Sequence, residues 1–104
     1  MLIAATGLFI NGCASPEMSS GGERVRVLSA DEVLVCGDRL GTTSSTVMAK
    51  VAGVKRPIET IESELTTMAR NSASDMGGDT IVPLTVVTDG KQSFEIYKCV
   101  GTSG

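Results

Sequence analysis

The sequence contains no histidine and no tryptophan, and its only aromatic residues are Phe9, Phe94 and Tyr97. Without an imidazole, the usual serine or cysteine hydrolase triads have no general base, and a zinc site loses one of its common ligands. The cysteines form no Cys-x-x-Cys pair, which argues against a thiol oxidoreductase. We therefore expect no catalytic residues, no cofactor and no metal site, and a core built from aliphatic side chains.

Positive charge is sparse as well. The chain has 9 Lys and Arg residues against 12 Asp and Glu residues, for a net charge of −3. The basic residues are scattered, and no aromatic side chains accompany them to form a stacking platform. Nucleic acid is therefore not an expected partner.

The most informative motif of the sequence is an apolar segment followed by a cysteine near the start of the chain. Residues 2–10 are apolar, and Ile10-Asn11-Gly12-Cys13 then leads into a small, polar stretch. This layout is typical of a bacterial lipoprotein signal, although no Lys or Arg precedes the apolar run and Asn11 is unusual at its position. We expect residues 1–12 to be a signal peptide and the thiol of Cys13 to carry the lipid. Alternatively, residues 2–10 are an ordinary core strand or helix followed by an unmodified cysteine.

The residue after the cysteine bears on localisation. In enteric-type lipoprotein sorting, Asp at that position favours retention at the inner membrane, and here the position holds Ala14. We expect a lipid-anchored protein of the outer membrane that faces the periplasm. Residues 14–24 are rich in Ser, Gly and Pro, which predicts that 13–24 form the lipidated cysteine and a flexible tether. Residues 25–104 then form a single periplasmic domain.

Two further cysteines remain once Cys13 is assigned to the lipid. Cys36 and Cys99 form an even set in an oxidising compartment, which predicts that they are disulfide-bonded. The bond would close a loop of about sixty residues and stabilise the domain by about 4 kcal/mol in the chain-entropy model. The alternative is two buried, reduced thiols.

The first part of the domain reads as short strands. Residues 25–27 alternate, and residues 33–36 are apolar and include two β-branched valines, so each segment predicts a strand. Gly37-Asp38 is expected to break the second strand, and the Thr-rich residues 39–47 could resume extended structure. Residues 48–56 mix apolar and basic side chains with Gly53, which predicts a mobile loop.

The second part carries a helix and a hairpin. Apolar residues recur at steps of three and four across residues 57–76, with Pro57 at the start and Gly77-Gly78 at the end, which predicts an α-helix. Residues 80–87 and 93–99 predict strands joined at Asp89-Gly90, with Pro83 at an edge or bulge. The expected fold is α+β, with one long helix on a mixed sheet of about four strands and a right-handed β-α-β crossover.

With these elements placed, residues 25–99 resemble small bacterial outer-membrane lipoproteins that share the fold of the stress sensor RcsF, including an uncharacterised family of the same size. The resemblance rests on residues 35–41, on residues 69–82 and on Tyr97-Lys98-Cys99. The block at 69–82, an Ala-rich helix ending in Gly-Gly-Asp before a β-branched strand, also occurs in related cytosolic oligomeric proteins once labelled heavy-metal-binding. The RcsF sensor has two disulfides, whereas this chain can form one. If the family pattern holds, Cys36 and Cys99 lie close enough to bond.

These observations predict a non-enzymatic lipoprotein whose domain acts through protein contacts, as an envelope sensor or assembly accessory. We expect an envelope protein as the partner, and the contact residues that we predict are Val51, Val54, Lys55 and Arg56, because they combine apolar and basic character. An additional strand or a disordered connector is the alternative for this segment. A small-ligand or metal-ion binding domain is the alternative function.

Overall fold

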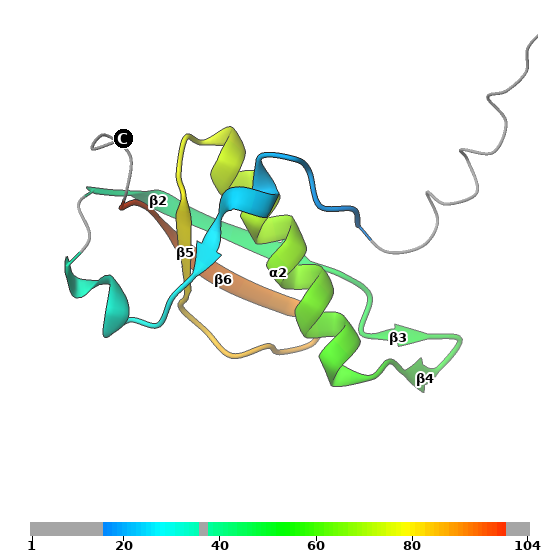
Figure 1. Cartoon of the computed structure of the whole chain (residues 1–104). Helices are drawn as coiled ribbons and strands as arrows, with labels where there is room; N and C mark the ends of the chain where they lie inside the picture. Colours follow the sequence, from blue (N-terminus) through cyan, green and yellow to red (C-terminus); the bar gives the residue numbers. More distant parts are fainter. Residues whose placement is uncertain (1–15, 36–37, 100–104) are drawn as a thin grey trace, which may run out of the picture.

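The computed structural model describes residues 16–35 and 38–99, so the predicted signal peptide, Cys13 and Cys36 lie outside the described residues. In chain order the elements are η2 (Gly22–Arg24), β1 (Arg26–Val27), η3 (Glu32–Val35), β2 (Asp38–Thr46), β3 (Lys50–Val51), β4 (Val54–Lys55), α2 (Ile58–Asp75), β5 (Thr80–Pro83) and β6 (Lys91–Lys98). The two η elements are short 3-10 helices. Figure 1 shows α2 lying across one face of the sheet formed by β2, β5 and β6.

The main sheet is four-stranded, in the order β1-β5-β6-β2. β1 pairs with β5 in parallel, whereas β6 pairs antiparallel with both β5 and β2. β3 and β4 form a separate two-stranded sheet. The predicted α+β class, with one helix on a mixed sheet and a C-terminal strand hairpin, is confirmed.

Helix α2 lies close to its predicted bounds. Its N-cap is Pro57, whose carbonyl oxygen accepts hydrogen bonds from the backbone N–H groups of Thr60 and Ile61. At the other end Gly77 adopts a φ of 87°, and the N–H of Gly78 donates to the carbonyl of Ala73 over 2.8 Å. This is a Schellman motif, which satisfies carbonyl groups that a helix end otherwise leaves without partners.

The core lies between α2 and the sheet. Apolar side chains that are fully or almost fully buried come from one face of the helix, from the two central strands and from the segment before β1, and they include Ile61, Leu65, Ala69, Ala73, Val25, Ile81, Phe94 and Ile96. The apolar stripe predicted for the helix extends beyond this core, because Ile58 and Met76 at its ends are 49% and 45% exposed.

The prediction of a strand at residues 33–36 is wrong for the part that the structure describes, since Glu32–Val35 forms the 3-10 helix η3. A capping box explains the difference. The N–H of Ser29 donates to Glu32 Oε1 over 2.8 Å, and the N–H of Glu32 donates back to Ser29 Oγ over 3.3 Å. This reciprocal pair favours a helical turn over the β-propensity of the valines that follow. Asp38 does not break a strand but begins β2.

The prediction of a loop at residues 48–56 is also wrong, because β3 and β4 form a hairpin there. Its two turn residues, Ala52 and Gly53, have φ values of 53° and 82°. Positive φ at both central positions defines the type I′ turn, whose twist matches that of paired strands. The alternative of an additional strand in this segment is therefore the one that the structure supports.

The hairpin between β5 and β6 has the predicted turn, with φ values of 50° at Asp89 and 76° at Gly90. β5 ends at Pro83, earlier than the predicted residue 87. The N–H of Leu84 donates to the carbonyl of Ser93 on β6, so the nitrogen of the preceding Pro83 points the other way. On that side β1 has already ended, and Pro83 occupies an edge position as predicted.

Candidate functional site

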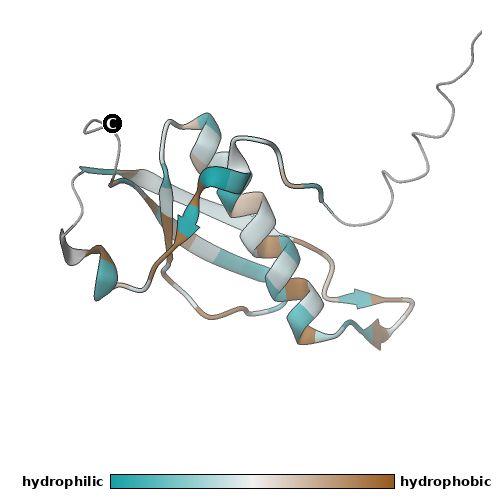
Figure 2. Ribbon diagram, in the orientation of Figure 1, coloured by the Kyte–Doolittle hydropathy of each residue, from teal (hydrophilic) through white to brown (hydrophobic). Residues whose placement is uncertain are grey.

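The predicted contact residues lie on and beside the β3–β4 hairpin. Val51 and Val54 are opposite each other on its two strands and are 51% and 68% exposed. Lys55 is also exposed and stands directly opposite Lys50. In Figure 1 the hairpin projects from the body of the domain near the N-terminal end of α2, and Figure 2 shows hydrophobic and hydrophilic colour side by side on it.

Arg56 differs from the other predicted contact residues, because it is held within the domain. Its Nη2 donates to Glu64 Oε2 on α2 over 2.6 Å, and its Nη1 donates to the carbonyl of Met48 over 2.9 Å. The side chains of Arg56 and Glu64 are 21% and 10% exposed. Through Arg56, both ends of the hairpin segment are bonded to α2, which gives this residue a structural role besides the contact role predicted for it.

The segment before β1 is attached to the same helix. The side-chain oxygen of Asn71 accepts from the N–H of Ser19 over 2.8 Å, and its Nδ2 donates to the carbonyl of Glu17 over 2.8 Å. Arg70 donates to two backbone carbonyls of η2, each over 3.1 Å. Residues 17–24 therefore lie against α2 and do not form the flexible tether that their composition predicts.

The start of the described chain also lies near the hairpin. Pro16 lines a surface pocket of about 290 Å³ together with residues from the first three turns of α2, among them Glu59 and Glu64. Glu64 is also the residue that binds Arg56, which directly follows β4. Pro16 therefore lies beside the N-terminal half of α2, to which the base of the hairpin is also bound.

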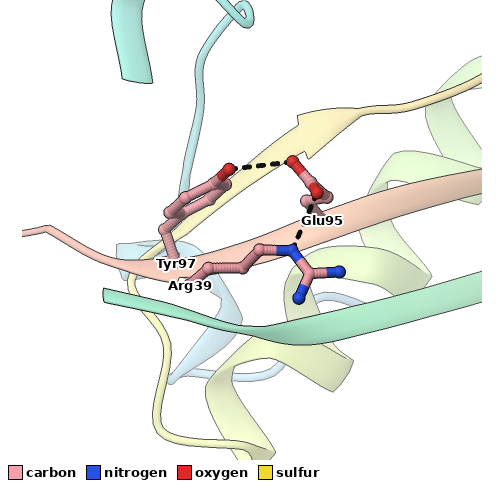
Figure 3. A network of polar contacts seen from close by, with 3 residues as sticks. All are labelled: Arg39, Glu95 and Tyr97. Carbon is pink, nitrogen blue, oxygen red and sulfur yellow. Dashed lines mark hydrogen bonds and ion pairs between the residues drawn. The ribbon is translucent and has the colours of Figure 1, made fainter. Parts of the chain in front are cut away.

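A polar cluster that the sequence did not predict lies on β2 and β6 (Figure 3). Arg39 Nε donates to Glu95 Oε2 over 2.8 Å, and the hydroxyl of Tyr97 donates to Glu95 Oε1 over 2.8 Å. Glu95 and Tyr97 alternate with the buried Phe94 and Ile96, so their side chains are on the sheet face opposite to α2. That alternation is legible in the sequence, but the partner on β2 is not, because a bulge between residues 39 and 41 shifts the register.

The cluster changes the acidity of two of its members. The hydrogen bond from Arg39 holds the pKa of Glu95 below its usual value, and the bond from Tyr97 acts in the same direction. The hydrogen bond to Glu95 in turn raises the pKa of Tyr97. At neutral pH the arrangement therefore keeps a carboxylate between two hydrogen-bond donors.

Strand β2 presents an edge of the main sheet. Among the described residues, only β6 pairs with it. The N–H of Val47 donates to Gly90 on the β6 side, and backbone groups alternate in direction along a strand. The N–H and C=O groups of Thr42, Ser44 and Thr46 therefore point away from β6, toward the edge.

Of the predicted cysteine sites, the described part of the chain contains only Cys99. It follows the last residue of β6, is partly exposed, and donates its backbone N–H to Asp79 Oδ1 over 2.7 Å. Within residues 16–35 and 38–99, no group of three carboxylate or thiol side chains is arranged to hold a metal ion. None of the helices in the described part is both long enough and apolar enough to span a bilayer.

Comparison with known proteins gives one relationship. No curated protein and no solved structure matches the chain. A family model described as a domain of unknown function, DUF4156, matches residues 16–99, which include every element of the fold above. The chain belongs to this DUF4156 family.

Proposed function

We propose that the protein is a non-enzymatic lipoprotein of the bacterial outer membrane, whose domain binds another envelope protein in the periplasm. The sequence around Cys13 and Ala14 supports the anchor and the membrane, and the resemblance to RcsF-like lipoproteins agrees with both. The geometry adds that Glu17, four residues after the proposed acylation site, is already bonded to Asn71 on α2.

The proposal includes a disulfide between Cys36 and Cys99. The β2–β6 ladder pairs Asp38 with Lys98, so position 36 precedes one paired residue by two and Cys99 follows the other by one. β2 therefore begins at the end of the ladder where β6 ends, so positions 36 and 99 flank the same end, as a covalent link between them requires.

Intact mass of the membrane-extracted protein, with and without reduction and alkylation, tests the anchor and the disulfide together. We expect a chain that starts at Cys13, carries acyl groups, and gains two alkylatable thiols only after reduction. A chain that retains residues 1–12 without acyl groups would refute the anchor. Two thiols that react before reduction would refute the disulfide independently of the anchor.

The open edge of β2 is the observation that carries the protein-contact part of the proposal. Thr42, Ser44 and Thr46 direct backbone donors and acceptors outward at a spacing of two residues, which is the pattern an added strand requires. Residues 41–46 contain no lysine and no proline, which are common devices that prevent strand addition at an edge. We infer that the partner contributes an extended segment that pairs with β2.

A proline at the edge tests this inference. Ser44→Pro removes an outward N–H, and proline is tolerated at an edge when its nitrogen faces away from the ladder. Ser44→Ala is the matched control, because both variants lose the 2.9 Å hydrogen bond between Ser44 Oγ and Ser93 Oγ, whereas only proline blocks the edge.

The readout is a photo-crosslinker placed at Thr46, in cells that carry the full-length protein. We expect a crosslinked product of defined mass that persists in Ser44→Ala and is lost in Ser44→Pro at equal protein levels. A product that is equally abundant in both variants would refute pairing at this edge. A product of twice the chain's own mass would identify a second copy and would refute the envelope partner.

A further inference from the structure

The β3–β4 hairpin concentrates exposed apolar side chains at one end of the molecule. Val51 and Val54 are on its strands, and Met48 and Ile58, on either side of it, are 64% and 49% exposed. An apolar surface of this kind is unfavourable in water and commonly marks a site that another surface covers. The hairpin is held in position by the Arg56–Glu64 ion pair at its base.

Positive charge borders this apolar surface. Lys50 and Lys55 are directly opposite each other and exposed, an arrangement that destabilises a two-stranded hairpin through like-charge repulsion. The charge of Arg56 is already paired with Glu64, and α2 carries exposed Glu59 and Glu62 beyond the hairpin. Lys50 and Lys55 are therefore the positive charges that the strands of the hairpin carry, and Asp89 lines a surface pocket together with them.

The position of Pro16 indicates what this surface meets. Pro16 packs beside the first three turns of α2, and Glu64 in those turns holds the base of the hairpin. An extended chain spans at most about 3.6 Å per residue, so Cys13 lies within about 11 Å of Pro16. An acyl group on Cys13 would thus keep the N-terminal half of α2, and the hairpin bound to it, near the bilayer.

We propose that the β3–β4 hairpin docks on the anionic phospholipid surface of the membrane that holds the acyl chains. Because neighbouring residues of a strand point to opposite faces, the lysine pair lies on the other face of the hairpin from the valine pair, so the hairpin meets the bilayer with its turn first. Val51 and Val54, next to the turn, enter the interface, and Lys50 and Lys55, one position further from the turn, reach lipid phosphates. This inference rests on the proposed lipid anchor. It fixes the orientation of the domain, which an anchor alone leaves undetermined.

The absence of tryptophan from the chain allows a direct test, because a single introduced tryptophan reports its own surroundings. Val54→Trp places the probe on the hairpin. Met76→Trp is the matched control, since Met76 is also exposed and lies at the opposite end of α2, about 27 Å away along the helix. Acylated, full-length protein is reconstituted in phosphatidylcholine vesicles with or without phosphatidylglycerol.

We expect the emission of Val54→Trp to shift to shorter wavelength and to be quenched by brominated lipid in the vesicles that contain phosphatidylglycerol, with no change for Met76→Trp. Adding Lys50→Gln and Lys55→Gln should weaken docking about five-fold for each lysine, or about 25-fold together. The same two changes should leave the far-UV circular dichroism spectrum unchanged.

The other outcomes overturn the inference at different points. If intact mass shows acyl groups and the probe at position 54 still does not respond, the hairpin proposal fails and the anchor stands. Equal shifts in both kinds of vesicle, unaffected by loss of the lysines, would exclude recognition of anionic lipid. A shift that requires added envelope protein and not lipid would assign the hairpin to a protein partner. A protein without acyl groups would refute the anchor on which the inference rests.

Discussion

Replacing Arg56 by methionine should destabilise the domain, because the Glu64 carboxylate is left without its cation. Arg56 makes two charge-assisted hydrogen bonds, to Glu64 and to the carbonyl of Met48. Such bonds contribute about 1.5–3 kcal/mol each when they are buried. Because Arg56 is 21% exposed, water replaces part of this interaction, and we expect a total loss of about 2–3 kcal/mol. For a domain of this size the melting temperature should fall by about 10–20 °C.

A double-mutant cycle of Arg56 and Glu64 distinguishes the loss of their ion pair from a nonspecific effect of mutation, because the two explanations predict different coupling free energies. Arg56→Met leaves the Glu64 carboxylate, 10% exposed, without its cation, whereas the double variant with Glu64→Met leaves no charge there. The double variant should therefore be more stable than the sum of the two single changes predicts. Lys55→Met, at an exposed lysine, is the control and should change stability by less than about 0.5 kcal/mol.

Urea and thermal unfolding, followed by far-UV circular dichroism, give the free energies of unfolding for this cycle. Strictly additive effects of Arg56→Met and Glu64→Met would contradict the coupling. An Arg56→Met variant as stable as Lys55→Met would contradict the structural role of the arginine. Because of this role, reversing the charge of Arg56 would also destabilise the domain, so a surface contact is better probed at Lys55 alone.

The remaining predictions concern the polar cluster and the two turns. Tyr97 is the only tyrosine, so its absorbance near 295 nm should titrate with a midpoint above 10.0, and Glu95→Gln should return it toward that value. Because the pKa of Glu95 is lowered, its ionisation should stabilise the fold above about pH 4.5, and this stabilisation should be lost as the pH falls through the lowered pKa. The unfolding midpoint of Glu95→Gln should therefore fall less at acid pH than that of the unmodified protein. Gly53 and Gly90 both have positive φ, but only at position 90 would a new Cβ clash with a neighbouring atom, the carbonyl oxygen of Val47. Gly90→Ala should therefore lower the free energy of unfolding in urea by more than Gly53→Ala, which has nothing within 4 Å of its new Cβ. If both variants lost the same free energy of unfolding, the positive φ of the backbone, and not the clash with Val47, would explain the destabilisation.

The parts of the fold that could be predicted from sequence are those that local signals specify. Helix α2 has a periodic apolar face, a proline at its start and a glycine pair at its end, and each of these acts within a few residues. The turn at Asp89-Gly90 likewise needs only residues that accept positive φ. The 3-10 helix η3, where the sequence predicts a strand, is also specified by a local signal. Ser29 and Glu32, three residues apart, form its capping box.

The candidate site depends on contacts that local signals do not encode. Ser19 and Asn71 are bonded across 52 residues of sequence, which makes a Ser- and Gly-rich segment part of the domain instead of a tether. Arg56 and Glu64 are closer in sequence, but only the fold of the hairpin shows that they meet. The contact role of Lys55 and Arg56 stays a prediction, and the structure adds that Arg56 also holds the hairpin to α2.

The proposed edge of β2 and the proposed membrane-docking hairpin constrain each other's position, because β3 and β4 directly follow β2 in the chain. Thr46, the last residue of β2, is four positions before Lys50, whereas Asp38 lies at the other end of the strand, about 26 Å away. With the hairpin at the bilayer, the outward backbone groups of residues 42–46 would lie at the membrane-proximal end of the edge. A strand that pairs there must come from a segment close to the same membrane. The crosslinker at Thr46 should therefore capture a membrane-associated protein, and a freely soluble periplasmic protein as the product would separate the edge from the membrane orientation proposed for the hairpin.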